Sequence, residues 1–239
     1  MYRFVTKKEL WAIEDSGLTA QLPASSLWHL KDVQDALAYN YLRHFKGKVI
    51  AEVGGGNSRL LPILARQNSC YNIEPYGGVG QGPATCTLPP EIVNVKAYCG
   101  RTDLIIKDEA FDVLFSISVV EHVPHDELEP FFTDSRRILK ASHGFACHLI
   151  DIYTAEEPGP ASMERYRWIH DIFFQHFSPL SSEIIDLQGE DWAKALRFRC
   201  CYASNPDNAM YGWNKLRPQL KEVRETHQCC SLILAGWAK

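Results

Sequence analysis

The sequence predicts a doubly wound α/β domain, in which a mostly parallel sheet carries helices on both faces. From residue 48 onward, short β-branched runs alternate with helix-like segments. The first run, Val49–Val53, ends in the glycine-rich turn Gly54–Gly56. Glu74 closes the second run, so the fold would bring it to the same edge of the sheet as the turn.

Residues 1–46 precede the first convincing buried strand and are predicted to form an N-terminal helical cap or lid segment. An amphipathic helix is expected from about residue 29 to residue 44, because apolar side chains recur there at helical spacing. These side chains are Leu30, Val33, Leu37 and Tyr41. The segment could pack against the core or close over a cleft, and the sequence leaves both arrangements open.

The main domain is predicted to span residues 47–239, with an aromatic, substrate-lining insertion near residues 153–180. Its strands are expected at residues 49–53, 70–74, 92–98, 111–118 and 145–152. The helix-like segments cover residues 58–66, 128–139 and 163–177. Pro62 is expected in the first turn of its helix, where its missing N–H costs no hydrogen bond. Two late β-like runs follow, at residues 195–203 and 228–237.

The second crossover departs from this alternation. Residues 75–83 are too rich in glycine and proline for an ordinary helix. The segment starts where a bound cofactor would lie, so it is either a mobile flap or a disordered surface loop. The aromatic residues of 163–177 could likewise line a substrate pocket, although burial in the core is their more frequent fate.

Composition narrows the possible partners and compartment. The 25 basic and 29 acidic residues give a net charge of −4, which offers no broad electrostatic footprint for nucleic acid. No apolar run is long enough to span a bilayer. None of the eight cysteines forms a Cys-x-x-Cys pair, so we expect reduced thiols in a cytoplasmic protein and no bound metal.

The turn at 54–56 is suited to a nucleotide-like ligand. Glycines at 54 and 56 permit positive φ and allow a ligand close to the backbone, while the next helix offers unpaired N–H groups to an anion. A carboxylate at Glu74 could accept both hydroxyls of a ribose. A dinucleotide-binding turn would need a third glycine where Arg59 stands. These features together favour an adenosine-containing cofactor.

Three segments resemble the class I S-adenosylmethionine (SAM)-dependent methyltransferases. Glu52-x-Gly54-x-Gly56 is similar to the first motif of that family. The block Phe111–Val123, which contains Glu121-His122, is similar to its fourth-strand motif, and residues 136–144 resemble the segment before its fifth strand. The resemblance covers roughly Lys48 to Asp151 and implies a seven-stranded sheet whose last strand is antiparallel to its neighbours.

The resemblance also implies roles for individual residues. Glu52, Gly54 and Gly56 would shape the floor under the methionine part of SAM, and Glu74 would hold the ribose. Ser118 would lie near the sulfonium. The family often places an acid near the adenine amino group. The direct alignment falls on residues 99–101 here, and the nearest acidic residue is Asp103.

The implied reaction is methyl transfer from SAM, which becomes S-adenosylhomocysteine, to an oxygen or nitrogen of a small molecule. His122 is the candidate general base, because histidine suits proton transfer near neutral pH. His148 is a weaker alternative, followed by Asp151 and His170. Motifs for methylating exocyclic amines or pyrimidine carbon in nucleic acid are absent. A SAM-binding partner subunit without transferase activity is the second hypothesis. The oligomeric state is left open.

Overall fold

The computed structural model describes the chain except residues 6, 24–29, 79–81, 142, 156–159 and 181–226. The helices are α1 (Lys7–Asp15), α2 (Leu30–Leu42), α3 (Leu61–Leu64), α4 (Leu128–Ile138) and α5 (Pro160–His176). The strands are β1 (Tyr2–Phe4), β2 (Val49–Val53), β3 (Ser69–Ile73), β4 (Val93–Val95), β5 (Val113–Ile117), β6 (Phe145–Ala155), β7 (Phe177–Pro179) and β8 (His227–Ala238). None of these helices is long and apolar enough to cross a membrane.

The strands form one mixed sheet in the order β1-β8-β6-β5-β2-β3-β4, and β7 also pairs with β8. The central strands from β4 to β6 are parallel to one another. Strand β8 runs antiparallel to β6 from the pair Phe145–Trp237 to the pair Ala155–His227. The predicted fold class is therefore confirmed, with the late antiparallel strand at residues 227–238. The other late run, residues 195–203, lies outside the described residues.

Two short strands were not expected from the sequence. Tyr2–Phe4 and Phe177–Pro179 both pair with β8, the first at residues 232–234 and the second at residues 236–238. Each is only three residues long, which is too short to establish a period of two in the sequence. The sheet therefore contains eight strands among the described residues, and the first of them lies within the segment that was predicted to be helical.

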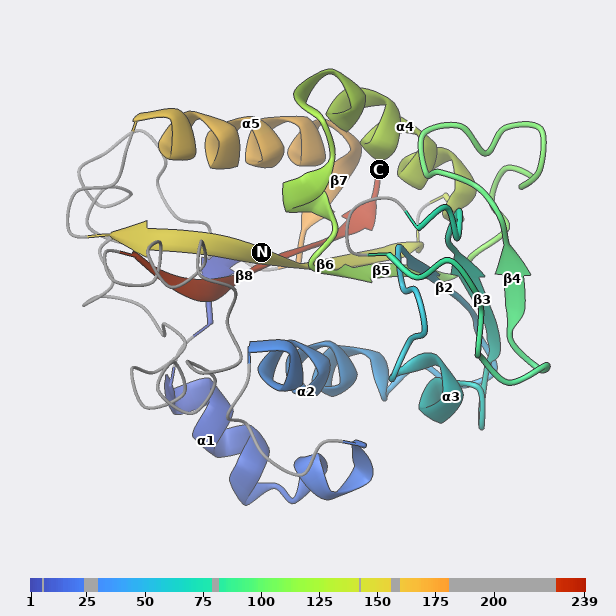
Figure 1. The fold of residues 1–239 in the computed structure, drawn as a ribbon, viewed down its shortest axis with the longest axis horizontal. Helices are drawn as coiled ribbons and strands as arrows, with labels where there is room; N and C mark the ends of the chain where they lie inside the picture. Colours follow the sequence, from blue (N-terminus) through green and yellow to red (C-terminus); the bar gives the residue numbers. More distant parts are fainter. Residues whose placement is uncertain (6, 24–29, 79–81, 142, 156–159, 181–226) are drawn as a thin grey trace.

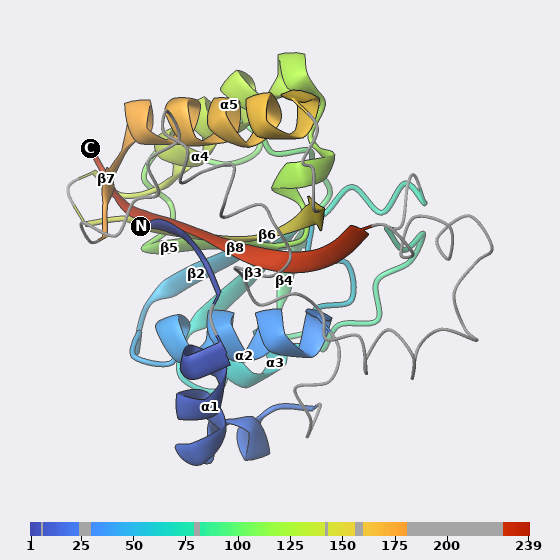
Figure 2. The same ribbon diagram turned by 90° about the vertical axis from the view of Figure 1, so that its left-hand side faces the viewer.

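Helices cover both faces of the sheet, with α4 and α5 on one side and α1, α2 and α3 on the other (Figure 1). The view after a quarter turn shows the same layers edge-on (Figure 2). Strand β5 shows how the sequence fills them: Leu114 belongs to the core cluster under α4 and α5, whereas Val113 and Phe115 belong to the cluster on the α2 side. This alternation is the period of two expected for a strand.

The helices follow the sequence pattern with one difference. Helices α2 and α4 lie within a few residues of their predicted bounds. Helix α3 covers only Leu61–Leu64, with Pro62 in its first turn as expected. The residues before it, Asn57 to Leu60, instead continue the glycine-rich turn. Ser58 stabilises the junction, because its hydroxyl oxygen accepts the N–H groups of Leu60 and Leu61 at 3.2 and 3.0 Å.

We predict that Gly236→Ala destabilises the fold. A Cβ at position 236 would lie 2.4 Å from the carbonyl oxygen of Ser178 and 3.1 Å from Cβ of Phe177. The β7–β8 pairing would have to shift, so urea denaturation should show a loss of about 1–3 kcal/mol in the free energy of unfolding. The control is Ser178→Ala, which removes an exposed hydroxyl from the facing strand and should leave stability nearly unchanged. Equal stability of Gly236→Ala and the wild type would contradict this prediction.

Candidate functional site

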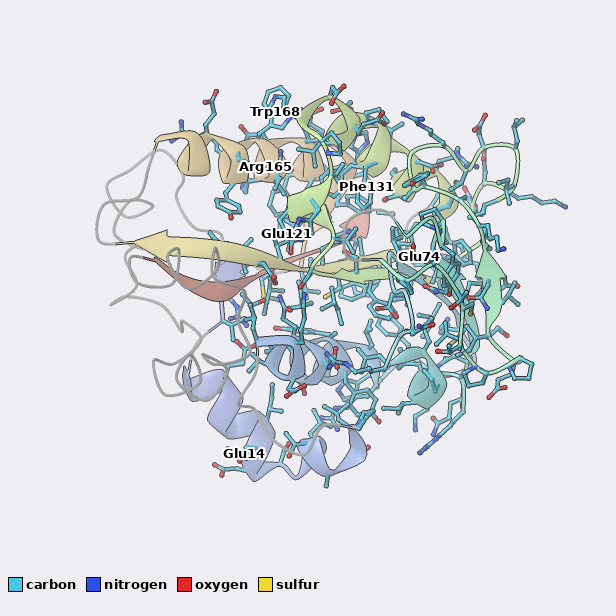
Figure 3. The ribbon with its side chains drawn as sticks, in the orientation of Figure 1. Glu14, Glu74, Glu121, Phe131, Arg165 and Trp168 are labelled. Atoms are coloured by element: carbon cyan, nitrogen blue, oxygen red, sulfur yellow. The ribbon has the colours of Figure 1, made fainter. Side chains whose placement is uncertain are left out.

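The candidate site lies where the carboxyl ends of the central parallel strands meet. Gly54 follows β2, Glu74 follows β3 and Ser118 follows β5. The register places them together, because Val53 pairs with Ile73 and Glu52 pairs with Phe115. Figure 3 labels Glu74 and Glu121 on this part of the molecule. Ligands of open α/β sheets bind in a crevice of this kind.

The glycine turn has a backbone that only glycine adopts freely. Gly54 has a φ of 65° and Gly56 a φ of 55°, both in the left-handed region. Gly55 is required for a different reason: a Cβ there would lie 2.6 Å from Oδ1 of Asn72 and 2.7 Å from Cδ of Glu52. Sequence reasoning missed Gly55 and Asn72, since neither stands in the spacing that defines the turn.

Glu52 lies beneath the turn. Its side chain is buried, and its Oε2 has no hydrogen-bond partner among the described residues. Burial raises the pKa of Glu52 to about 8, and the hydroxyl of Ser58 only partly opposes that effect. A buried carboxyl group with a free oxygen beside a glycine turn is typical of a binding site.

Glu74 reaches back to the turn from the end of β3. Its Oε2 accepts the N–H of Gly56 at 3.2 Å, and its Oε1 accepts the N–H of Tyr76 at 3.2 Å. A carboxylate has about four acceptor positions. Glu74 therefore has lone pairs left for two hydroxyl donors.

The loop after β3 packs against the glycine turn. The Tyr76 hydroxyl lies 3.0 Å from the carbonyl oxygen of Gly56 and 2.7 Å from Nδ2 of Asn72. Pro83 approaches Gly56 so closely that a Cβ there would lie 3.0 Å from its Cδ. The described parts of residues 75–83 thus cover the turn. Whether the segment acts as a flap remains a prediction, and residues 79–81 lie outside the described residues.

Arg59 links the turn to helix α2. Its Nε lies 2.6 Å from Oδ2 of Asp35, and its Nη1 lies 3.4 Å from Oδ1 of Asp32. Burial raises the pKa of Asp35 to about 6 despite the neighbouring guanidinium. Arg59, which stands where a dinucleotide-binding turn has its third glycine, therefore points toward helix α2.

A polar cluster lies beyond the turn, around Ser118. Its hydroxyl is 2.7 Å from Oδ1 of Asp151 and 2.9 Å from Oε1 of Gln34. Nε2 of Gln34 donates to Oδ1 of Asp151 at 2.7 Å and to Oγ of Ser231 at 3.2 Å. Ser118 also has a φ of 54°, a conformation that is uncommon for a non-glycine residue. The cluster joins α2, β5, β6 and β8 in one network.

Gln34 is the clearest site residue that the sequence reasoning missed. It is fully buried, four residues after Leu30 and three before Leu37, so it shares the apolar face of α2. A glutamine on that face was the available signal. Its partners could not be found in the same way, because Asp151 and Ser231 are far from it along the chain.

Glu121 and His122 follow β5 in the short 3₁₀ turn Val120–His122. The Glu121 side chain is 8% exposed and His122 is 67% exposed, with 3.9 Å between Oε1 and Nε2. Oε1 of Glu121 accepts the N–H of Asp151 at 3.1 Å. The two neighbours in sequence therefore have opposite environments. The buried one contacts the polar cluster, and the exposed one contacts solvent.

The other candidate histidines lie elsewhere. His148 is fully buried among aromatic rings, with Nδ1 2.8 Å from Oγ of Ser116. Burial lowers its pKa to about 3, so the ring is neutral at physiological pH. His170 lies on α5, where its Nδ1 is 2.8 Å from a carboxylate oxygen of Asp171. No described contact joins either ring to the Ser118 cluster.

The predicted adenine-binding segment follows β4. Asp134 of α4 orders it, since its Oδ2 accepts the N–H of Gly100 at 2.7 Å and the hydroxyl of Thr102 at 2.7 Å. Asp103 is exposed and lines a shallow hollow with Gly100 and Asp134. The assignment of Asp103 to adenine remains a prediction, as do the binding roles of the other site residues.

The sequence matches one family model, described as a methyltransferase domain, over residues 51–147. A comparison with curated proteins gives no significant match. The chain is 24% identical to a putative methyltransferase from an antibiotic biosynthesis pathway of Anabaena variabilis. That match covers 67% of this chain and 60% of that one, with a TM-score of 0.41.

Two further solved structures share the fold more fully. A phosphoethanolamine N-methyltransferase 2 of Haemonchus contortus has a TM-score of 0.52 at 12% identity, covering 87% of this chain and 53% of that one. A geranyl diphosphate C-methyltransferase of Streptomyces coelicolor has a TM-score of 0.52 at 8% identity. That match covers 88% of this chain and 80% of that one. The chain thus spans only 53–60% of the length of the first two proteins.

The matched segment contains the glycine turn, Glu74 and Ser118, and it ends within β6. The sheet order and the antiparallel β8 agree with the fold of the solved methyltransferases. Residues 51–147 match the methyltransferase-domain family model, and the chain has the fold of the class I SAM-dependent methyltransferases.

Proposed function

We propose that the protein transfers a methyl group from SAM to an oxygen or nitrogen of a small-molecule acceptor. The observation that carries the proposal is the pairing of the glycine turn with Glu74, whose Oε2 lies 3.2 Å from the N–H of Gly56. This pairing places a carboxylate with free lone pairs beside a backbone that a ligand can approach closely. The family match over residues 51–147 supports SAM as that ligand.

The residues present fit SAM. Glu74 would hold the ribose hydroxyls, and the free Oε2 of Glu52 lies under the turn where the amino acid portion of the cofactor would rest. Gly54 and Gly56 have no side chain that would occupy the space under the methionine part of the cofactor, and Ser118 would border the sulfonium. Bound there, the cofactor supplies an electrophilic methyl group. The chain's own residues bind it, orient it and exclude water from it.

The acceptor would enter beside the Ser118 cluster. Helix α5 covers this region, since the hydroxyl of Tyr166 donates to the carbonyl oxygen of Asp151 at 3.3 Å. Holding an acceptor atom in line with the methyl group is the main task of such a site. Polar groups of Ser118 and Asp151 suit an acceptor that carries a hydroxyl or amine. This chemistry favours oxygen or nitrogen over carbon.

The N-terminal segment belongs to the proposed site. Gln34 contributes to the Ser118 cluster, and Asp35 pairs with Arg59 of the turn. We therefore propose that residues 1–46 act as a cap that completes the acceptor side. The cap is fixed to the domain through α2, whose apolar side chains lie in the core.

A SAM-binding partner subunit would share the cofactor site but transfer nothing. Calorimetry with SAM comes first, followed by incubation with radiolabelled methyl-SAM and a panel of phenols, alcohols and amines. Labelled product from any acceptor would support the enzyme. Binding without transfer to every member of the panel would favour the partner subunit, and absence of SAM binding would contradict both hypotheses.

We predict that Glu74→Gln weakens SAM binding. The variant replaces an acceptor-only group with one that presents an NH₂, so a ribose hydroxyl loses a charge-assisted partner. Isothermal titration calorimetry should show a roughly tenfold or larger increase in Kd. The control is Glu91→Gln, an exposed acid before β4, which should bind SAM as the wild type does. Unchanged affinity in Glu74→Gln would contradict the proposed ribose role.

We also predict that the protein loses stability as pH rises from about 5 to 8. The folded pKa of Glu52 is about 8 and its ordinary value is 4.5. Between these values the folded state holds a proton that the unfolded state has released, so stability falls with pH. Each such group contributes a slope of up to about 1.4 kcal/mol per pH unit.

Glu52→Gln removes this group while keeping its size. Urea unfolding at several pH values between 5 and 8 should show a smaller slope in that variant than in the wild type. Glu14→Gln serves as the control, because Glu14 is an exposed acid on α1 and its removal should leave the slope unchanged. An identical slope in Glu52→Gln and the wild type would contradict a protonated Glu52.

A further inference from the structure

We propose that Glu121, rather than His122, receives the proton that the acceptor's hydroxyl or amine loses, and that His122 passes this proton to solvent. The inference rests on the proposed function and names the proton path within the same site. Glu121 has a buried carboxyl group with one free oxygen among the described residues, whereas the neighbouring imidazole of His122 is exposed.

Only one of the two carboxyl oxygens of Glu121 has a hydrogen-bond partner among the described residues. Oε1 accepts the N–H of Asp151 at 3.1 Å. Oε2 is buried and has no hydrogen-bond partner among the residues that the structure describes. A buried acceptor without a partner is costly, so such an oxygen is best explained by a donor that arrives with a ligand.

Helix α5 holds the backbone of the turn that carries Glu121. Arg165 of α5 donates to the carbonyl oxygen of Glu121 at 3.3 Å and also to the carbonyl oxygen of Val123. Figure 3 shows Arg165 on the side of α5 that faces Glu121. The guanidinium therefore stabilises the backbone, and no described hydrogen bond joins it to the carboxyl group. This arrangement leaves the Glu121 side chain available to an acceptor.

Burial and one neighbouring charge make the Glu121 carboxylate a stronger base. Burial is the main effect and the nearby carboxylate of Asp151 adds to it, so the pKa of Glu121 rises to about 8. Lys31 of α2 opposes this shift, and its Nζ lies 3.6 Å from Oδ2 of Asp151. Among the described residues, Arg165 and the exposed His122 also lie beside Glu121. A general base is most effective when its pKa lies near the working pH.

The other candidates in the site are less suitable. Oδ1 of Asp151 is already 2.7 Å from both Oγ of Ser118 and Nε2 of Gln34, and its Oδ2 lies near Lys31. His148 is enclosed by aromatic rings in the core. His122 has a side chain that is 67% exposed, so water would compete with any acceptor for its nitrogens.

In the proposed proton step, the proton passes from the acceptor to Glu121 and then to His122. The O–H or N–H bond of the acceptor breaks, an O–H bond forms at Glu121, and the electron pair stays on the acceptor atom that takes the methyl group. Nε2 of His122 lies 3.9 Å from Oε1 of Glu121. Once the two side chains come within hydrogen-bond range, the O–H bond at Glu121 breaks as an N–H bond forms at Nε2 of His122, and the imidazolium then releases that proton to water.

Sinefungin provides a test that needs no identified acceptor. It resembles SAM but carries an amine-bearing carbon in place of the methylated sulfonium, so its ammonium group would occupy the position next to the acceptor. We expect Glu121→Gln to raise the Kd of sinefungin roughly tenfold. The Kd of S-adenosylhomocysteine, which lacks that ammonium group, should stay unchanged. In the wild type, the affinity ratio of sinefungin to S-adenosylhomocysteine should rise more between pH 6.5 and 8 than in the variant.

The control is Asp126→Asn, which removes an exposed carboxylate five residues further along the chain and should leave both affinities unchanged. His122→Gln should also leave the sinefungin ratio unchanged at fixed pH. Equal binding of sinefungin to Glu121→Gln and the wild type would overturn the inference, as would an equal loss for both ligands. Failure of the wild type to bind S-adenosylhomocysteine would instead contradict the proposed function.

Discussion

The parallel register of β2 between β3 and β5 is the constraint on which the candidate site depends. Val53 pairs with Ile73 and Glu52 with Phe115, so all three strands end at one edge. The glycine turn, Glu74 and Ser118 meet there although they are separated along the chain. A shift of one residue in either pairing would turn every side chain of that strand to the opposite face, and a shift between β2 and β3 would also separate Glu74 from Gly56.

The site concentrates buried carboxyl groups, which work against stability. The pKa values of Glu52 and Glu121 both rise to about 8, mainly through burial. Each therefore has a pKa close to the physiological range in the folded chain, so both its protonated and its ionised forms are populated there. Two such groups under one sheet edge are difficult to explain by folding alone, because a buried acid costs free energy when it ionises. A ligand that donates hydrogen bonds would offset that cost.

The N-terminal segment and the sheet are closely joined. Strand β1 pairs with β8, Arg59 pairs with Asp35, and Gln34 reaches Asp151. The Gln34 contacts connect a helix, two parallel strands and the antiparallel strand at one point. A change in α2 is therefore expected to affect the acceptor side of the site as well as the core.

The sequence by itself determined the fold class, the central strands and the glycine turn. These features are local: the pattern of Val49–Gly56 and the periodicity of residues 128–139 require no knowledge of distant contacts. The short strands at Tyr2–Phe4 and Phe177–Pro179 could not be predicted, since each exists only because β8 offers an edge to pair with.

Only the tertiary structure decided which polar groups meet. It placed Gln34 against Asp151, buried Glu121 and exposed His122, although the last two are neighbours in the chain. The physical reason is that burial and hydrogen bonding depend on contacts across the sheet and with α5. Sequence spacing identifies the turn that a cofactor can approach, whereas the environment of each carboxyl group is set by the elements that enclose it.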